Sequence, residues 1–156
     1  MRRDTGLIIC ILLAMLWSVS CLGAEVEEPV SLASVSPSVV RTVPQCGESA
    51  VDPSLNEVSV TFSKDMKVTG HCWSWCWIQE DSFPVLAGQP RFLEDNRTCV
   101  LTVALEPEKT YAIWINTEEY RSFQDIDGHA AVPYLMVFRT AAAGESSDTS
   151  VGVGAD

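Results

Sequence analysis

The stretch LEPEKTYAIWI, residues 105–115, decides the fold of this chain. It has the pattern of a strand end, a tight turn around Pro107, and a new strand whose first large residue is Tyr111. In Greek-key sandwiches a tyrosine at this place covers the open end of the core, and its hydroxyl bonds back to the backbone of the turn. The stretch therefore predicts two packed antiparallel sheets, closed at one end by Tyr111.

Short runs of alternating apolar and polar residues lie on both sides of this stretch, and turn residues bound each of them. The clearest is residues 57–62, in which Val58, Val60 and Phe62 share one face. Further strands are expected at residues 38–43, 71–79, 91–93, 98–105, 111–115 and 134–139. Because no segment has a convincing amphipathic helix pattern, the sequence predicts an all-β fold. The fold class is a single immunoglobulin-like or fibronectin-III-like β-sandwich of about seven strands.

The N-terminal end reads as an export signal, residues 1–23. Two arginines precede an unbroken apolar run over residues 7–17, and small residues follow it. The run is too short to cross the roughly 30 Å of membrane hydrocarbon as a helix. Two cleavage sites stay open: before Cys21, which would then be lipidated as in bacterial lipoproteins, or after Gly23 or Ala24. We expect an extracellular or periplasmic protein, or one anchored to the membrane by lipid.

Two further segments are expected to lie outside the folded part. Residues 24–35 are acidic and lack alternation, so they read as a flexible linker. Residues 141–156 are rich in Ala, Gly, Ser and Asp, so they cannot bury enough apolar surface to order themselves and are expected to be a disordered tail. The remaining residues, 36–140, suffice for one sandwich.

The charge balance argues against nucleic-acid binding. The chain carries a formal net charge of −11 at neutral pH. Cleavage before Cys21 would leave 8 of the 10 basic and 20 of the 21 acidic residues. Surfaces that bind phosphate backbones need clustered Lys and Arg, and the sequence contains no such cluster. We interpret the acidity as a solvated surface that keeps an exported protein soluble.

Four cysteines remain after the signal, and three alternatives stay open for them. Cys46, Cys72, Cys76 and Cys99 could be buried or free thiols, or could form at least one disulfide after export. If residues 72–76 are extended, their ends lie about 13 Å apart, too far for a bridge. A metal site with His71 is the third alternative, but Cys-x3-Cys is not a standard zinc spacing and no second pair follows. We therefore expect no metal.

The sequence offers little for catalysis. The chain has only two histidines, His71 and His129, and contains no nucleophile-elbow serine or phosphate-binding glycine loop. Residues 125–128 resemble the start of a calcium loop. The sixth and twelfth positions hold Ala130 and Met136, however, where an EF-hand needs glycine and an acid. We interpret the segment as a hairpin turn with positive φ at Gly128. No catalytic residue and no cofactor is expected.

The tryptophans of residues 71–79 pose the one functional question. Trp73, Trp75 and Trp77 share one face if this segment is a strand. They either fill the core or form an exposed strip, and exposed aromatic strips stack on sugar rings or bury into partner proteins. Trp114 lies on the opposite face of its strand from Tyr111 and is a candidate for a further surface aromatic.

Several short motifs occur once each along the chain, in a characteristic order. They are Pro44-Gln45-Cys46-Gly47, Val51-Asp52-Pro53, Val58-Ser59-Val60-Thr61-Phe62-Ser63, Lys64-Asp65-Met66, Leu105 with Pro107 and Tyr111, Asp125-Ile126-Asp127-Gly128-His129, and Phe138-Arg139-Thr140. In this order the chain resembles a bacterial Ig-like domain of the surface-layer-protein (SbsA-like) type, over residues 37–140. Glu108 stands where that family often has glycine, and His129 replaces its common asparagine. The resemblance implies a non-catalytic extracellular or envelope module.

The sequence therefore predicts an exported, non-catalytic structural or interaction module of the bacterial cell envelope or extracellular space. The alternative is a small carbohydrate-binding module that uses Trp73, Trp75 and Trp77. The expected partner is an unidentified envelope protein or polysaccharide. Nucleic acid is not expected, and membrane contact is expected only through a lipid anchor at Cys21.

Overall fold

A computed structural model of the chain describes residues 30–69 and 74–144. Apart from Val30, these residues belong to one compact unit, Ser31–Asp156. The predicted signal with Cys21, most of the predicted linker and most of the predicted tail lie outside the described residues. Within the described part of the chain, no helix is long and apolar enough to cross a membrane.

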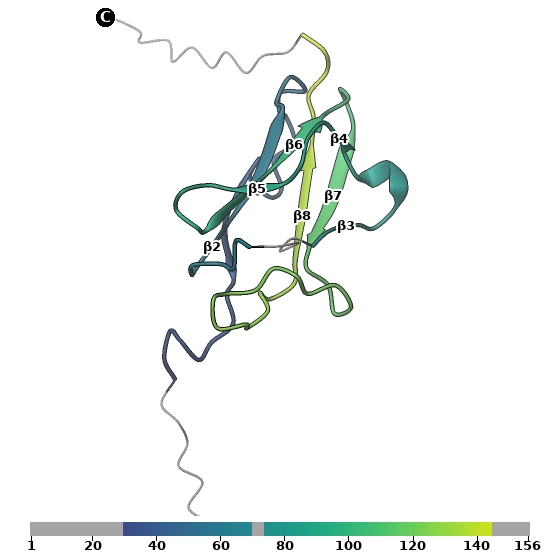
Figure 1. Cartoon of the computed structure of the whole chain (residues 1–156). Coiled ribbons are helices and arrows are strands. Elements are labelled where there is room, and N and C mark those ends of the chain that lie inside the picture. Colours follow the sequence, from purple (N-terminus) through teal and green to yellow (C-terminus); the bar gives the residue numbers. More distant parts are fainter. Residues whose placement is uncertain (1–29, 70–73, 145–156) are drawn as a thin grey trace, which may run out of the picture. The chain divides into compact units, whose positions relative to one another are not determined.

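Short strands in two antiparallel sheets make up this unit (Figure 1). In the described ranges they are β1 (Val39–Val43), β2 (Glu57–Phe62), β3 (Trp75–Trp77), β4 (Val85–Leu86), β5 (Arg91–Phe92), β6 (Thr98–Ala104), β7 (Thr110–Ile115) and β8 (Tyr134–Arg139). One sheet has the order β1-β2-β6-β4, with β5 also paired to β6, and the other has the order β3-β7-β8. The predicted all-β sandwich is confirmed.

The core lies between the sheets and is supplied by alternate positions of the long strands. In β2 the burial alternates strictly, with Val58, Val60 and Phe62 almost fully buried. The register places Val58 opposite Leu101 and Val60 opposite Cys99 on β6, and all four side chains are buried. The period-2 pattern in the sequence therefore locates this layer correctly.

The predicted tyrosine corner is confirmed. Tyr111 is 1% exposed, and its hydroxyl accepts a hydrogen bond from the backbone N–H of Glu106 at 2.8 Å. The Tyr111 ring packs on Phe138, with 5.3 Å between centroids. Glu108 adopts φ +56° in the turn, the left-handed conformation that glycine accepts most readily. The end of the sandwich is closed as the sequence indicated.

The strand expected at residues 71–79 is shorter than predicted. Residues 70–73 lie outside the described ranges, and β3 ends at Trp77. A 3-10 turn, η1 (Glu80–Ser82), follows it. In this turn the N–H and hydroxyl of Ser82 both donate to the carbonyl of Gln79, at 3.0 and 2.7 Å. The segment that follows contains the two-residue strand β4, which the sequence did not predict.

Candidate binding site

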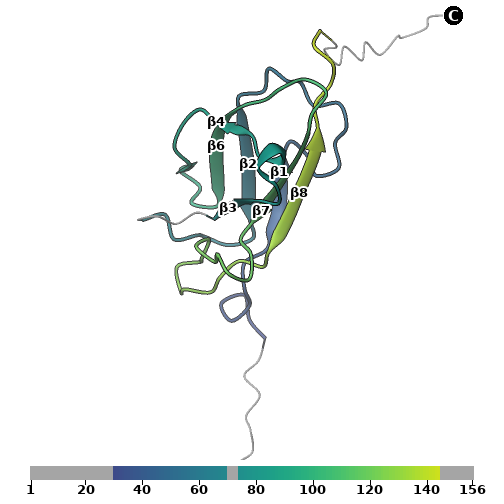
Figure 2. The same cartoon turned by 90° about the vertical axis from the view of Figure 1, so that its right-hand side faces the viewer.

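The sandwich has two lateral openings. Figure 2 shows β3 and β4 on one side and β1 and β8 on the other, in agreement with their places at the ends of the two sheet orders. The opening between β3 and β4 holds a cavity of about 840 Å³. We call it the aromatic groove, and its large lining residues are Trp75, Trp77, Phe83, Leu86, Pro90 and Tyr120.

The strand β3 supplies two of these aromatic rings. Trp75 and Trp77 are two residues apart, so they share one face of β3 while Cys76 points to the other face. Trp75 is half-buried and packs edge-on against the core ring of Phe123 at 5.7 Å between centroids. Trp77 is 64% exposed and meets Phe83 edge-on at 6.3 Å. The same face therefore reaches from the core into solvent.

These positions combine the two sequence alternatives for the tryptophans. Trp75 takes the core role in part, while Trp77 takes the exposed role. Trp73, the third predicted member, lies outside the described residues. Phe83, Tyr120 and the other groove residues were missed from the sequence, because they come from segments with no strand periodicity of their own.

The indole N–H of Trp75 is buried and lacks a well-formed hydrogen bond among the described residues. It lies against the thiol of Cys99, and sulfur is only a weak acceptor. Burial raises the pKa of the Cys99 thiol to about 12, although the contact with Trp75 and the charge of Arg91 act in the opposite direction. Leaving a buried N–H without a good partner costs about 1–3 kcal/mol, which the packing of the Trp75 ring on Phe123 must offset.

Acidic residues lie in the chain segments that supply the groove. Glu80 and Asp81 stand between Trp77 and Phe83 in the chain, and Glu118 and Glu119 directly precede Tyr120; all four acids are exposed. Burial and then the charge of Glu119 raise the pKa of the Cys76 thiol, which is on the other face of β3 from the two tryptophans. Two exposed cations also adjoin lining residues: Arg121 lies between Tyr120 and Ser122, and Arg91, which pairs with Glu57, follows Pro90. The segments that supply the groove therefore carry more acidic than basic residues.

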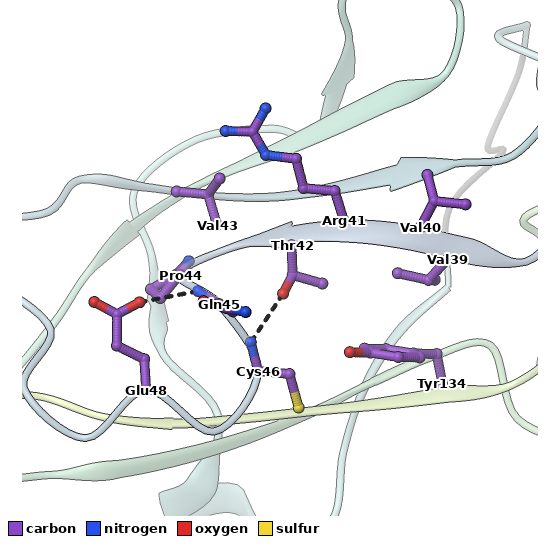
Figure 3. Close-up of a pocket in the computed structure, with 10 residues that line it drawn as sticks. All are labelled: Val39, Val40, Arg41, Thr42, Val43, Pro44, Gln45, Cys46, Glu48 and Tyr134. Carbon is purple, nitrogen blue, oxygen red and sulfur yellow. Dashed lines mark hydrogen bonds between the residues drawn. The ribbon is translucent and has the colours of Figure 1, made fainter.

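The opposite opening is narrower and mostly polar (Figure 3). Its cavity of about 580 Å³ lies between β1 and Tyr134. Thr42 accepts a hydrogen bond from the N–H of Cys46 at 3.1 Å, and burial and the nearby Cys46 raise the pKa of Tyr134, against a hydrogen bond with Thr42. The N–H of Gly47 donates to the carbonyl of Val137 at 2.7 Å. The chain's own loop therefore covers part of the β8 edge.

Three of the four candidate cysteines lie in the described part of the chain. Cys46 is exposed, Cys76 is half-buried and Cys99 is buried, and all three are unpaired there. The thiol of Cys46 donates to the carbonyl of Leu135 at 3.5 Å. Cys72 lies outside the described residues, so the disulfide alternatives that include it stay predictions.

The segment of residues 125–129 forms the predicted hairpin turn. Gly128 has φ +91°, which confirms the expected positive φ. One carboxylate oxygen of Asp125 accepts from the N–H groups of Asp127 and His129, and the other accepts from Lys64 Nζ at 3.0 Å and lies 3.1 Å from His129 Nδ1. Burial raises the pKa of Asp125, but these hydrogen bonds outweigh it and lower the pKa to about 2.

The same turn contains the metal-ligand cluster of the described ranges. The ligand atoms of Asp125, Asp127 and His129 lie within 4.8 Å of one another. The ammonium group of Lys64 already neutralises the Asp125 carboxylate, so the cluster is explained as a turn held by its own cation. His71, the other candidate ligand from the sequence, lies outside the described residues.

Comparisons with known proteins concern the fold alone. No family model matches the chain, and no curated protein matches it. A crystal structure of the S-layer protein SbsC is 19% identical, covers 70% of this chain and 14% of its own, and has a TM-score of 0.45. The N-terminal part of the bacterial S-layer protein SbsC is also 19% identical, with 70% and 24% covered and a TM-score of 0.46.

A third solved structure, CopC from Methylosinus trichosporium OB3b, is 15% identical to the chain. It covers 70% of this chain and 98% of its own, with a TM-score of 0.50. The likeness to CopC agrees with the β-sandwich seen here. The chain spans about a quarter or less of the two SbsC structures.

Proposed function

We propose that the chain is an exported, non-catalytic Ig-like module of the bacterial cell envelope or the extracellular space, which holds a partner through the aromatic groove. One observation carries this proposal: large apolar side chains are exposed together on this side of the sandwich. They are Trp77, Leu86 and Tyr120, which all line the groove and are each between 53% and 64% exposed. Exposed apolar surface gathered in one place marks an interaction site.

The Ig-like assignment is supported by the tyrosine corner and by the order of the surface-layer-type motifs. Tyr111 bonds back to Glu106, and the turn at Asp125 and Gly128 occupies the place that the motif order gives it. The unit has the two facing antiparallel sheets that such modules need. Folds of this kind commonly present loops and edges to partners.

The absence of turnover is supported by the state of the groups that could react. Catalytic cysteines act as thiolates, but the pKa of Cys99 is about 12 and that of Cys76 is raised. His129 is engaged with the Asp125 carboxylate in the turn. These groups serve the fold, which fits a module that binds without reacting.

Export, with or without a lipid anchor, rests on the sequence of residues 1–23. Intact mass and N-terminal sequencing of the mature protein test it. Uptake of labelled palmitate that is lost in Cys21→Ser shows the anchored form; cleavage after Gly23 or Ala24 without label shows the free form. A chain that keeps residues 1–23 and stays in the cytoplasm contradicts the proposal.

Capture from a bacterial envelope fraction tests the binding role. We expect the immobilised mature protein to retain a partner that Trp77→Ala does not retain. Trp114→Ala is the matched control, because Trp114 lies on the other face of the sheet from the core. Equal capture by both variants would remove the groove from the proposal.

A small carbohydrate-binding module is the second candidate function. The exposed ring of Trp77 favours it, because such rings stack on the faces of sugars. Saturable pelleting with an insoluble polysaccharide, lost in Trp75→Ala and Trp77→Ala, supports this role. Absence of the protein from the pellet counts against it.

A further inference from the structure

We infer that the aromatic groove takes an extended, positively charged segment of another protein, which pairs with the free edge of β3. The inference rests on the proposed function and names the chemistry of its partner. It follows from three features of the groove: a strand edge without a neighbour among the described residues, apolar side chains beside that edge, and an excess of acidic residues in the segments that supply it.

The backbone of β3 provides the edge. β3 pairs with β7 on one side and has no partner strand on the other within the described residues. In an antiparallel ladder the N–H and C=O groups of alternate residues point to opposite edges. The N–H of Asn116 donates to the carbonyl of Ser74, so Ser74 and Cys76 face β7. The peptide groups of Trp75 and Trp77 therefore face the groove side, where an added strand can bond to them.

The side chains beside this edge suit alternate apolar residues of such a strand. Trp77 and Phe83 form one wall of the groove, and Leu86 and Pro90 line it near β4. Every second side chain of an extended segment would enter the groove, since side chains alternate along a strand. The cavity of about 840 Å³ has room for several such side chains.

The charge of the surrounding residues decides which kind of occupant is expected in the groove. The exposed acids Glu80, Asp81, Glu118 and Glu119 lie in the chain segments that supply the groove and outnumber the cations there, Arg91 and Arg121. Complementary charge therefore favours a cationic partner. A second copy of the chain is disfavoured, because the formal net charge is −11 and like charges repel. A neutral polysaccharide would stack on the aromatic rings, but its affinity would gain nothing from the nearby acidic residues. A basic, extended peptide segment uses all three features.

A synthetic peptide of alternating lysine and valine is the probe. We expect it to bind the full mature protein with one-to-one stoichiometry by calorimetry. The same peptide with N-methylated internal amides keeps its charges and side chains but cannot donate hydrogen bonds to β3. We expect that peptide, and an alternating glutamate–valine peptide, to bind at least about tenfold more weakly.

Two pairs of variants locate the binding. Trp77→Ala is expected to weaken it about tenfold or more, while Trp114→Ala leaves it unchanged. The double variant Glu118→Gln/Glu119→Gln is expected to weaken it and to reduce its salt dependence. The control Glu94→Gln/Glu108→Gln makes the same charge change at exposed residues of two other turns, those that precede β6 and β7. Far-ultraviolet dichroism checks that each variant folds. If a tryptophan variant does not fold, the two glutamine pairs still test the inference.

Absence of peptide binding, or equal binding of the N-methylated peptide, overturns the inference. So does equal weakening by the two glutamine pairs, because binding would then follow net charge alone. Trp77-dependent binding of a neutral polysaccharide without peptide binding also overturns it, yet leaves the proposed groove intact. If neither probe binds but an envelope partner is retained through Trp77, the inference fails and the proposed function stands.

Discussion

Tyr111 and Trp77 lie on paired strands of one sheet, but their surroundings are opposite. Tyr111 on β7 is 1% exposed, and its hydroxyl has a hydrogen-bond partner within the corner. Trp77 on β3 is 64% exposed, and β3 ends with it. Since burial of an aromatic side chain is a large source of stability, the sheet uses one ring to close the sandwich. The ring of Trp77 stays exposed at the edge of the same sheet.

The largest expected effect is at the closed end. Tyr111→Ala removes a buried ring and leaves a cavity beside Phe138, so we expect the free energy of unfolding to fall by about 3–5 kcal/mol. Urea denaturation measures it. Tyr120→Ala is the control, because Tyr120 is 57% exposed, and it should change the value by no more than about 0.5 kcal/mol. Similar losses in both variants would erase the contrast between the two regions.

Asp125 is a second side chain whose polar atoms have hydrogen-bond partners within the fold, in contrast to the exposed Trp77. The folded pKa of Asp125 is about 2, below its ordinary value of 3.8. The unfolded chain therefore binds the proton more readily, and the stabilisation is present above about pH 4 and is lost as the pH falls toward 2. We expect this carboxylate to account for up to about 2 kcal/mol of that loss.

Unfolding measured at several pH values between 2 and 5 checks the Asp125 prediction. Asp125→Asn should be less stable at neutral pH and show a shallower dependence over that interval. An unchanged pH profile in the variant would mean that Asp125 does not hold the turn.

The closed end could be predicted from the sequence, and the groove could not. Tyr111, the β2 alternation and Gly128 are set by local rules: a turn, a period of two and a positive φ. The groove depends on where β3 ends and on the turn that follows it, in which Ser82 bonds to Gln79. It also depends on Phe83 and Tyr120, which are far apart in sequence and meet only in the folded sandwich.

The corner itself contains a small strain that a glycine would relieve. Glu108 has φ +56°, which costs a residue with a Cβ about 1–2 kcal/mol. Glycine avoids this cost but loses more chain entropy on folding. We expect Glu108→Gly to raise the free energy of unfolding by about 0.5–1 kcal/mol. Glu106→Gly, outside the left-handed region, is the control and should not stabilise; a loss of stability in Glu108→Gly contradicts the prediction.

The smallest expected effect on stability is at the groove. Trp77→Ala removes a ring that is mostly in solvent, so the free energy of unfolding should change by no more than about 0.5 kcal/mol. The same variant should lose the partner. Thermal unfolding and a binding assay on one sample compare the two properties. A large loss of stability with binding retained would show that Trp77 belongs to the core.

The most direct test of the groove is the nuclear magnetic resonance spectrum of the tryptophan indole N–H groups during titration with the lysine–valine peptide. Trp75 and Trp77 line the groove, whereas Trp114 points away from the core. The mature chain also contains Trp73, so variants that each replace one tryptophan assign the four signals, and three of them are compared. The account predicts that the signals of Trp75 and Trp77 move with one common saturation curve while that of Trp114 stays fixed. Movement of the Trp114 signal alone, or no movement of any of the three, would contradict it.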